Sequence, residues 1–172
     1  FVFFYKEYQK KNYNNLTNKF NYAITNYNKG DKELYIKEFK EIINTHNKTY
    51  APLSLFFIID NKLIESKIEV NQLFDQIIDK ANLENQIREL MIYKKALFNA
   101  DDILENELVK ILNPVINSKS IWKPHSLLLL GDYFLSKGEK EKAKDFFMQI
   151  LSDEKSNQNI IFQSQQRMRI NF

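Results

Sequence analysis

Apolar residues recur three and four positions apart along almost the whole chain, with polar residues between them. That spacing places the apolar side chains on one face of an α-helix. Sustained alternation with a period of two, which would indicate strands, is absent. Gly and Pro, the usual helix breakers, number only three each. The pattern therefore predicts an all-α fold.

Capping residues set the expected boundaries in the first half of the chain. Gly30 is expected to form a left-handed C-terminal cap for the first helix, and Asp31 to cap the N-terminus of the second. A third helix is predicted from about Thr49 to Asp60, because Pro52 is tolerated in a first helical turn. A fourth helix follows, with its apolar stripe over 70–78.

In the second half, a fifth helix over about 87–98 precedes a sixth that is expected to start at Asp101-Asp102. Pro114 and Pro124 are expected to bracket a connection, because Pro disrupts helix interiors. The last three helices are predicted to end at 136, to cover 139–151 and to begin near 157.

The helices also repeat. Four anchor positions, 30, 65, 99 and 138, lie 35, 34 and 39 residues apart. Offsets of 5, 9 and 12 from each anchor select apolar residues, namely Tyr35, Phe39 and Ile42; Val70, Phe74 and Ile77; Leu104, Leu108 and Ile111; Ala143, Phe147 and Ile150. A period in the mid-thirties built from two helices is typical of tetratricopeptide repeats. The prediction is therefore helical hairpins stacked as a short right-handed solenoid.

The last hairpin matches the tetratricopeptide pattern most specifically, through Leu130, Gly131, Phe134, Gly138, Ala143 and Phe147. Gly131 is expected to let the two helices approach closely, and Gly138 to form the turn between them. Ala143 would keep the helix crossing tight, and Phe147 would fill the space between adjacent hairpins. With Gly30, Tyr35, Phe39 and Trp122, these residues form the predicted repeat-packing set.

The same segment resembles a narrower family. Trp122, Leu130-Gly131, the stretch 135–139 and Ala143 are similar to the C-terminal repeat of YfgM-type tetratricopeptide-like proteins, ancillary subunits of the bacterial Sec translocon. The stretches 47–53 and 168–171 also resemble that family. The resemblance implies an N-terminal anchor in the cytoplasmic membrane, a domain facing the periplasm, and translocon subunits or exported proteins as partners. The family is rich in Ala, whereas this chain has six.

The first residues, Phe1-Val2-Phe3-Phe4-Tyr5, are apolar and lead into Lys6, Lys10 and Lys11. They fit either the outgoing end of a transmembrane helix or the apolar start of a soluble helix. The family resemblance favours the first interpretation. Residues 1–12 are accordingly expected to include the end of an anchor, and residues 13–172 to form the repeat domain.

Composition argues against most enzyme and metal chemistry. The chain has no Cys, which removes thiolate zinc sites and thiol nucleophiles, and only two His, at 46 and 125. No Gly-rich phosphate loop is present. Among the 25 basic residues only three are Arg, and Lys alternates with acidic residues, so a nucleic-acid partner is not expected.

Four further features have structural explanations that outweigh chemical ones. Asp101-Asp102 fits a helix N-cap better than a metal site. His125 follows Pro124 in a first helical turn, where solvent exposure is expected, and Ser136 ends a helix. The lysines at 94–95 and at 140, 142 and 144 are expected on solvated faces. The tyrosines at 5, 8, 13, 22 and 27 suit either peptide capture or packing on a hairpin, and packing is favoured.

Two functions of different classes remain. The first is a non-enzymatic binding module, anchored at the cell envelope, that presents a groove to another polypeptide and assists translocation or periplasmic chaperone traffic. The second is a structural scaffold that forms homo-oligomers or other assemblies. Neither requires a cofactor.

Overall fold

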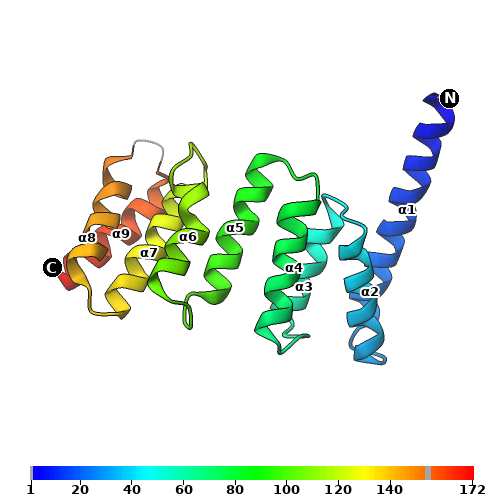
Figure 1. The fold of residues 1–172 in the computed structure, drawn as a ribbon, viewed down its shortest axis with the longest axis horizontal. Coiled ribbons are helices and arrows are strands. Elements are labelled where there is room, and N and C mark those ends of the chain that lie inside the picture. The colour runs from blue at the N-terminus through cyan, green and yellow to red at the C-terminus, as the bar shows by residue number, and fades with distance from the viewer. Residues whose placement is uncertain (1, 154–155) are drawn as a thin grey trace. The chain divides into compact units, whose positions relative to one another are not determined.

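The computed structural model describes residues 2–153 and 156–172, with side chains from Glu7 onward except those of residues 8 and 9. The described chain contains nine helices and no strand (Figure 1). Their bounds are α1 (Val2–Asn26), α2 (Lys32–Asn44), α3 (Tyr50–Asp60), α4 (Lys67–Lys80), α5 (Asn85–Asn99), α6 (Glu105–Ile116), α7 (Lys123–Ser136), α8 (Lys140–Ser152) and α9 (Gln158–Asn171). The predicted all-α class is confirmed.

The helices form two compact units, one up to Glu84 and the other from Asn85. In the first unit each helix packs on the next, and α1 also contacts α3. In the second unit the same order recurs: α5 to α9 pack successively, while α7 contacts both α5 and α9. Helices of alternate number thus touch within each unit. The chain is a helical repeat.

The first unit has an aromatic core. Phe39 of α2 is fully buried and its ring lies 4.8 Å from that of Phe57 and 6.2 Å from that of Phe20.

The N-terminal cap of α2 follows the sequence prediction: Asp31 accepts a hydrogen bond from the backbone N–H of Glu33, at 2.9 Å. This hydrogen bond satisfies one of the backbone N–H donors that a helix N-terminus otherwise leaves free.

The second unit buries a continuous apolar cluster that includes Leu130, Phe134, Ala143 and Phe147. Gly131 of α7 lies against the ring of Phe147, so the predicted close approach of α7 and α8 is confirmed. Phe147 of α8 therefore packs against α7 of its own hairpin. The sequence pattern predicted that this side chain packs between adjacent hairpins and did not predict this contact. Gly138 adopts a left-handed φ of 77° in the turn between these helices, as predicted.

The twelve repeat positions are buried except Leu104 and Ile111, both belonging to the third anchor. In α6 the buried positions are instead Leu108, Leu112 and Val115. Leu104 lies at the N-cap position of α6 with 67% of its side chain exposed. The 5, 9, 12 offset rule therefore holds for the anchors at 30, 65 and 138 and fails at two of the three positions of the anchor at 99.

The sixth helix was predicted incorrectly at both ends. It begins at Glu105, and Asp101-Asp102 lie in the preceding turn, where the backbone N–H of Asp102 donates to the carbonyl of Asn99. Acidic residues of the first turn, Glu105 and Glu107, take the favourable position near the helix dipole. Pro114 lies inside α6 rather than after it. The helix continues past Pro114 because Leu112 and Val115 are both fully buried.

The prediction for Gly30 is also wrong in one respect, because Gly30 does not adopt a left-handed conformation. Among the described non-glycine residues, His46 (φ 53°) and Lys62 (φ 51°) do so, and they follow α2 and α3. At Gly30 a Cβ would lie 3.1 Å from the hydroxyl of Tyr35, so the absence of a side chain there serves packing. The left-handed residues that follow α2 and α3 are thus not glycines, whereas the one that follows α7 is Gly138.

No helix within the described residues combines the length and the apolar composition needed to cross a bilayer. The expectation that Phe1–Tyr5 ends a membrane anchor concerns side chains outside the described residues.

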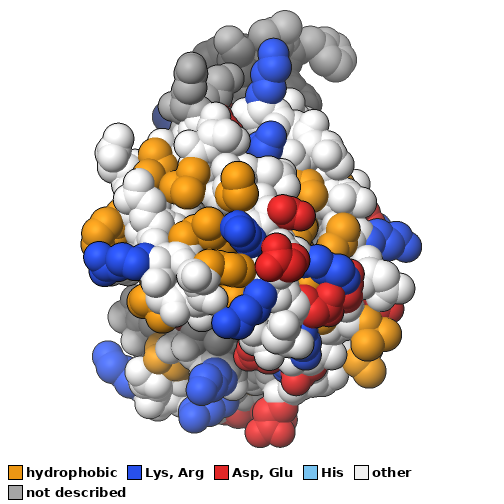
Figure 2. All heavy atoms as spheres, turned by 90° about the vertical axis from the view of Figure 1, so that its left-hand side faces the viewer, with side chains coloured by type: hydrophobic (Ala, Val, Ile, Leu, Met, Phe, Trp, Pro, Cys, Tyr) orange, Lys and Arg blue, Asp and Glu red, His pale blue; other side chains and the backbone are white. Residues whose placement is uncertain are grey.

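Apolar side chains are exposed on α8 and α9 and at the chain end. Figure 2 shows that hydrophobic side chains on this side of the second unit are interspersed with Lys, Arg and acidic side chains. The exposed residues, between 39% and 75% accessible, are Met148, Leu151, Phe162, Ile170 and Phe172. Lys144 covers part of this surface, with its Nζ 5.8 Å from the Phe172 ring centre.

Candidate functional site

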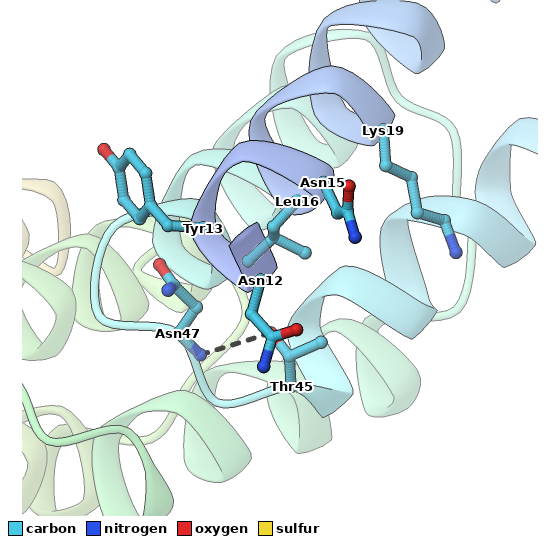
Figure 3. A pocket seen from close by; sticks show the side chains of 7 residues that line it. All are labelled: Asn12, Tyr13, Asn15, Leu16, Lys19, Thr45 and Asn47. Atoms are coloured by element: carbon cyan, nitrogen blue, oxygen red, sulfur yellow. Dashed lines mark hydrogen bonds between the residues drawn. The ribbon is translucent and has the colours of Figure 1, made fainter. Parts of the chain in front are cut away.

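A groove in the first unit lies between α1 and the turn that joins α2 to α3 (Figure 3). Its volume is about 440 Å³, within the range of ligand-binding pockets. The lining residues are Asn12, Tyr13, Asn15, Leu16 and Lys19 of α1 and Thr45 and Asn47 of the turn. We call this feature the α1 groove.

The turn that lines one side of the α1 groove is held by its own side chains. Asn47 Oδ1 accepts hydrogen bonds from the backbone N–H groups of Thr49 (2.9 Å) and Tyr50 (3.0 Å), and so caps α3. Thr45 Oγ1 donates to the carbonyl of Ile42 (2.6 Å) and accepts from the N–H of Asn47 (3.3 Å). His46, between them, is left-handed. This side of the groove is therefore preorganised.

The α1 wall is anchored by Tyr50 of α3. The rings of Tyr13 and Tyr50 lie 5.6 Å apart, and the Tyr50 hydroxyl is 2.8 Å from Thr17 Oγ1. A hydrogen bond with Tyr50 raises the pKa of Tyr13. Tyr13 still exposes 47% of its side chain.

Tyr13 therefore packs against Tyr50 and also lines the groove. Tyr27 packs edge-on against Phe57, and its hydroxyl donates a hydrogen bond to Asn61 Oδ1 (2.7 Å). Tyr22 is 56% exposed beside Tyr35. The described members of the tyrosine series thus support packing, with Tyr13 also open to a ligand. Tyr5 and Tyr8 fall outside the described side chains.

The α1 groove has no uncompensated charge among its lining residues. Lys19 forms an ion pair with Glu41 of α2, and hydrogen bonding to Lys19 lowers the pKa of the Glu41 carboxyl. The amides of Asn12 and Asn15 are exposed and form no hydrogen bond with described residues, whereas Asn47 uses only its Oδ1. Figure 3 shows Asn12 directed at the turn, with Asn15 and Lys19 farther along α1. Neutral amide groups thus dominate the polar lining.

A second cluster, in the second unit, joins α5 to the start of α7. The ring of Trp122 stacks on Tyr93 at 6.0 Å, and its indole N–H donates to the carbonyl of Gln86 (3.0 Å). Glu89 accepts from the hydroxyls of Ser118 (3.1 Å) and Ser120 (2.7 Å). The predicted packing role of Trp122 agrees with these contacts.

His125 belongs to this cluster rather than to the solvent, contrary to expectation. Its ring lies 5.3 Å from Trp122 and 5.9 Å from Tyr93, and its Nδ1 is buried without a hydrogen-bond partner among the described residues. Burial lowers the pKa of His125, with a smaller opposing effect from the backbone of Ile121. The neutral imidazole is therefore the favoured form here.

The predicted repeat-packing residues fall into two groups, and none lines the α1 groove. Gly30, Tyr35 and Phe39 pack in the first unit, and the others lie in the second, where all of them pack except Gly138, which is exposed in its turn. Ser136 ends α7 and donates to the carbonyl of Tyr133 (2.7 Å). Across the described residues, no group of three or more His, Asp or Glu side chains is placed to hold a metal ion.

Of the predicted lysine faces, Lys142 pairs with both Glu105 (2.8 Å) and Glu139 (2.7 Å), and these partners raise its pKa. Lys140 donates to the carbonyl of Asn171 (3.0 Å). These lysines thus tie α8 to neighbouring elements of the second unit.

Comparisons of the chain with protein-family models, with curated proteins and with solved structures find no match.

Sequence reasoning missed every lining residue of the α1 groove except Tyr13. Asn12 is four positions before Leu16 and so lies beside the apolar stripe of the first helix, whereas Asn15 lies farther around the helix. The position of Asn12 was the available signal. The contribution of Thr45 and Asn47 depended on the folding of the turn against α1.

Proposed function

We propose that this protein is a non-enzymatic binding module of tetratricopeptide-like repeats that presents a groove to another polypeptide. The observation that carries the proposal is the contact between alternate helices, α1 with α3, α5 with α7 and α7 with α9. In stacked hairpins the first helices of successive repeats line one surface, which is where such proteins bind extended ligands. The right-handed solenoid remains part of this proposal.

The packing of the last hairpin supports the same repeat type. Gly131 and Ala143 supply the small residues at the α7–α8 contact, and Gly138 supplies the turn. The α1 groove adds a concave site on the first helix of the first hairpin, with both polar and apolar lining residues.

The cellular setting is proposed from the sequence resemblance. A YfgM-type protein is anchored in the bacterial cytoplasmic membrane, faces the periplasm and meets translocon subunits or exported proteins. Tethering raises the effective concentration of a weak binder near such partners, so modest affinity for each polypeptide suffices. The proposal includes no cofactor, metal ion or nucleic acid.

Membrane fractionation and site-specific crosslinking test this function. A photoreactive amino acid would replace Asn15 in the α1 groove of the full-length protein, with the same replacement at Asn14, which does not line the groove, as the matched control. We expect the protein in the membrane fraction and crosslinks to envelope or translocon proteins from position 15 well above those from 14. A cytosolic full-length protein, or equal crosslinking from both positions, contradicts the proposal.

Self-association is a second candidate, favoured by the exposed apolar residues of α8 and α9, among them Met148 and Phe162. Light scattering of the purified protein tests it. A concentration-dependent dimer that Phe162→Ser abolishes would support a scaffold, and a monomer at all concentrations would remove this candidate.

A further inference from the structure

We propose that the α1 groove holds the main chain of an extended, uncharged polypeptide segment through the side-chain amides of Asn12, Asn15 and Asn47. The inference rests on the proposed binding function and adds the chemical class of the ligand. It predicts recognition of peptide groups rather than of a particular side-chain sequence.

The first argument is the hydrogen-bonding capacity of three groove amides that the described residues leave unused. A primary amide carries a carbonyl acceptor and two N–H donors, the same groups that a peptide unit offers in complementary form. Asn12 and Asn15 make no hydrogen bond with described residues, and Asn47 retains both Nδ2 donors because only its Oδ1 caps α3. Three amides therefore line one groove with donors or acceptors that no described residue uses.

The second argument is charge. Lys19 is the one charged lining residue of the α1 groove, and it is paired with Glu41. The phenol of Tyr13 is uncharged at neutral pH, because the ordinary pKa of a tyrosine is about 10. A charged side chain of a ligand would lose water here without gaining a free counter-charge, which is unfavourable. The lining therefore suits a neutral segment.

The third argument distinguishes an extended segment from a helix. In a helix the backbone N–H and C=O groups are bonded internally and cannot pair with the amides of the groove. An extended segment leaves those groups free and directs alternate side chains to opposite sides. Leu16 and the ring of Tyr13 give the inward side chains an apolar wall, and the rigid turn at Thr45 lowers the entropic cost of binding.

The test uses defined peptides on the purified chain. The probe is a mixed library of fluorescent, N-acetylated, C-amidated nonapeptides that contain only Ser, Thr, Ala, Val and Gln. A matched library carries N-methyl groups on alternate backbone amides, which removes main-chain donors and keeps the side chains. A third library places Asp or Lys at every second position. Fluorescence anisotropy gives the affinity of each.

We expect the neutral library to bind, and the N-methylated and charged libraries to bind about tenfold or more weakly, as the loss of two hydrogen bonds implies. The double variant Asn12→Ala/Asn15→Ala should lose a similar factor. Its matched control is Asn14→Ala/Asn18→Ala on the same helix, because neither Asn14 nor Asn18 lines the groove. The control should bind as the parent does, and circular dichroism should show both variants folded, because all four side chains are exposed.

Three results would overturn the inference: no binding of the neutral library, equal binding of the N-methylated library, or unchanged affinity of the Asn12/Asn15 variant. Each is distinguishable from failure of the proposed function. If groove crosslinks to envelope proteins persist while the N-methylated library binds equally well, the protein binds polypeptides through their side chains, and only the inference fails.

Discussion

The backbone of Gly131 lies so close to Phe147 that a Cβ at position 131 would stand 2.3 Å from Cε1 of the ring. The other two nearest atoms, Cζ and Cδ1, would be at 2.7 and 2.9 Å, and Phe147 is fully buried. Any side chain at 131 therefore requires either the ring or the helices to move.

Gly131→Leu should accordingly lower the free energy of unfolding by about 1–3 kcal/mol or more through overpacking. Helix propensity alone predicts the opposite sign, because Gly is about 1 kcal/mol less favourable than Ala inside a helix. Chemical denaturation followed by circular dichroism measures the difference. Pairing Gly131→Ala with Phe147→Leu should recover part of the loss of Gly131→Ala. A Leu variant more stable than the parent would show that α7 and α8 do not approach closely at this point.

The left-handed residues at helix ends give a prediction of opposite sign. Lys62 has a φ of 51°, and the N–H groups of Lys62 and Leu63 donate to the carbonyls of Ile59 and Ile58. A left-handed conformation costs a non-glycine residue about 1–2 kcal/mol. Lys62→Gly should therefore stabilise the protein by about 1 kcal/mol, after the greater freedom of Gly in the unfolded chain is subtracted.

Gly138→Ala tests the same principle in reverse. Gly138 has a φ of 77°, and nothing lies within 4 Å of the position that a Cβ would take. The variant should lose about 1 kcal/mol through backbone strain alone. Thermal denaturation of both variants provides the measurement, and shifts of the same sign would contradict the assigned turn geometry.

Acid should weaken the α5–α7 cluster through His125. Burial lowers the folded-state pKa of His125 from its ordinary value of 6.5. As the pH falls through about 6.5, the unfolded chain binds a proton before the folded chain does, so the free energy of unfolding falls. Stability that is present above the unfolded pKa is thus lost progressively below it.

His125→Phe keeps a flat ring against Trp122 and Tyr93 but cannot titrate. Between about pH 7 and pH 5 its stability should depend less on pH than that of the parent. Carboxyl groups contribute equally to both proteins, so the difference between the two curves isolates His125. Parallel curves would show that His125 is protonated equally well in the folded chain.

Glu89 of α5 should be the acidic residue on which the α6–α7 connection depends most. Its two oxygens accept from Ser118 and Ser120, and Ser120 Oγ in turn accepts from the N–H of Trp122 (3.0 Å). Hydrogen bonds to a charged group contribute about 1.5–3 kcal/mol when both partners are shielded from water. Because Glu89 is half-buried, Glu89→Ala should cost about 1–3 kcal/mol, measured by urea denaturation. Glu65→Ala, at an exposed loop position, is the control and should change stability by less than about 0.5 kcal/mol.

Local signals predicted most of the fold. Asp31 before an apolar stripe, and Pro52 near its start, mark helix boundaries that the structure confirms, because a cap or a fixed φ acts within one turn. The same logic failed at Pro114, where burial of Leu112 and Val115 outweighs the loss of one backbone hydrogen bond. Tertiary packing decided that boundary, and the local sequence carries no measure of it.

The α1 groove was harder to predict, because it joins Asn12 and Asn15 to a turn about thirty residues later in the chain. Tyr13 was noticed because aromatic residues at helical spacing are conspicuous. Asn15 was not, since an exposed Asn on a helix has the same sequence signature whether it faces water or a groove, and for Asn12 the one signal was its place beside the apolar stripe.

Trp122 is the chain's one tryptophan and lies in the second unit, whereas seven of the nine tyrosines precede Glu84. Light that excites indole but not phenol therefore produces emission from the second unit alone, while tyrosine absorbance comes mainly from the first. A single denaturation series thus follows the two units through separate optical signals, with no added label.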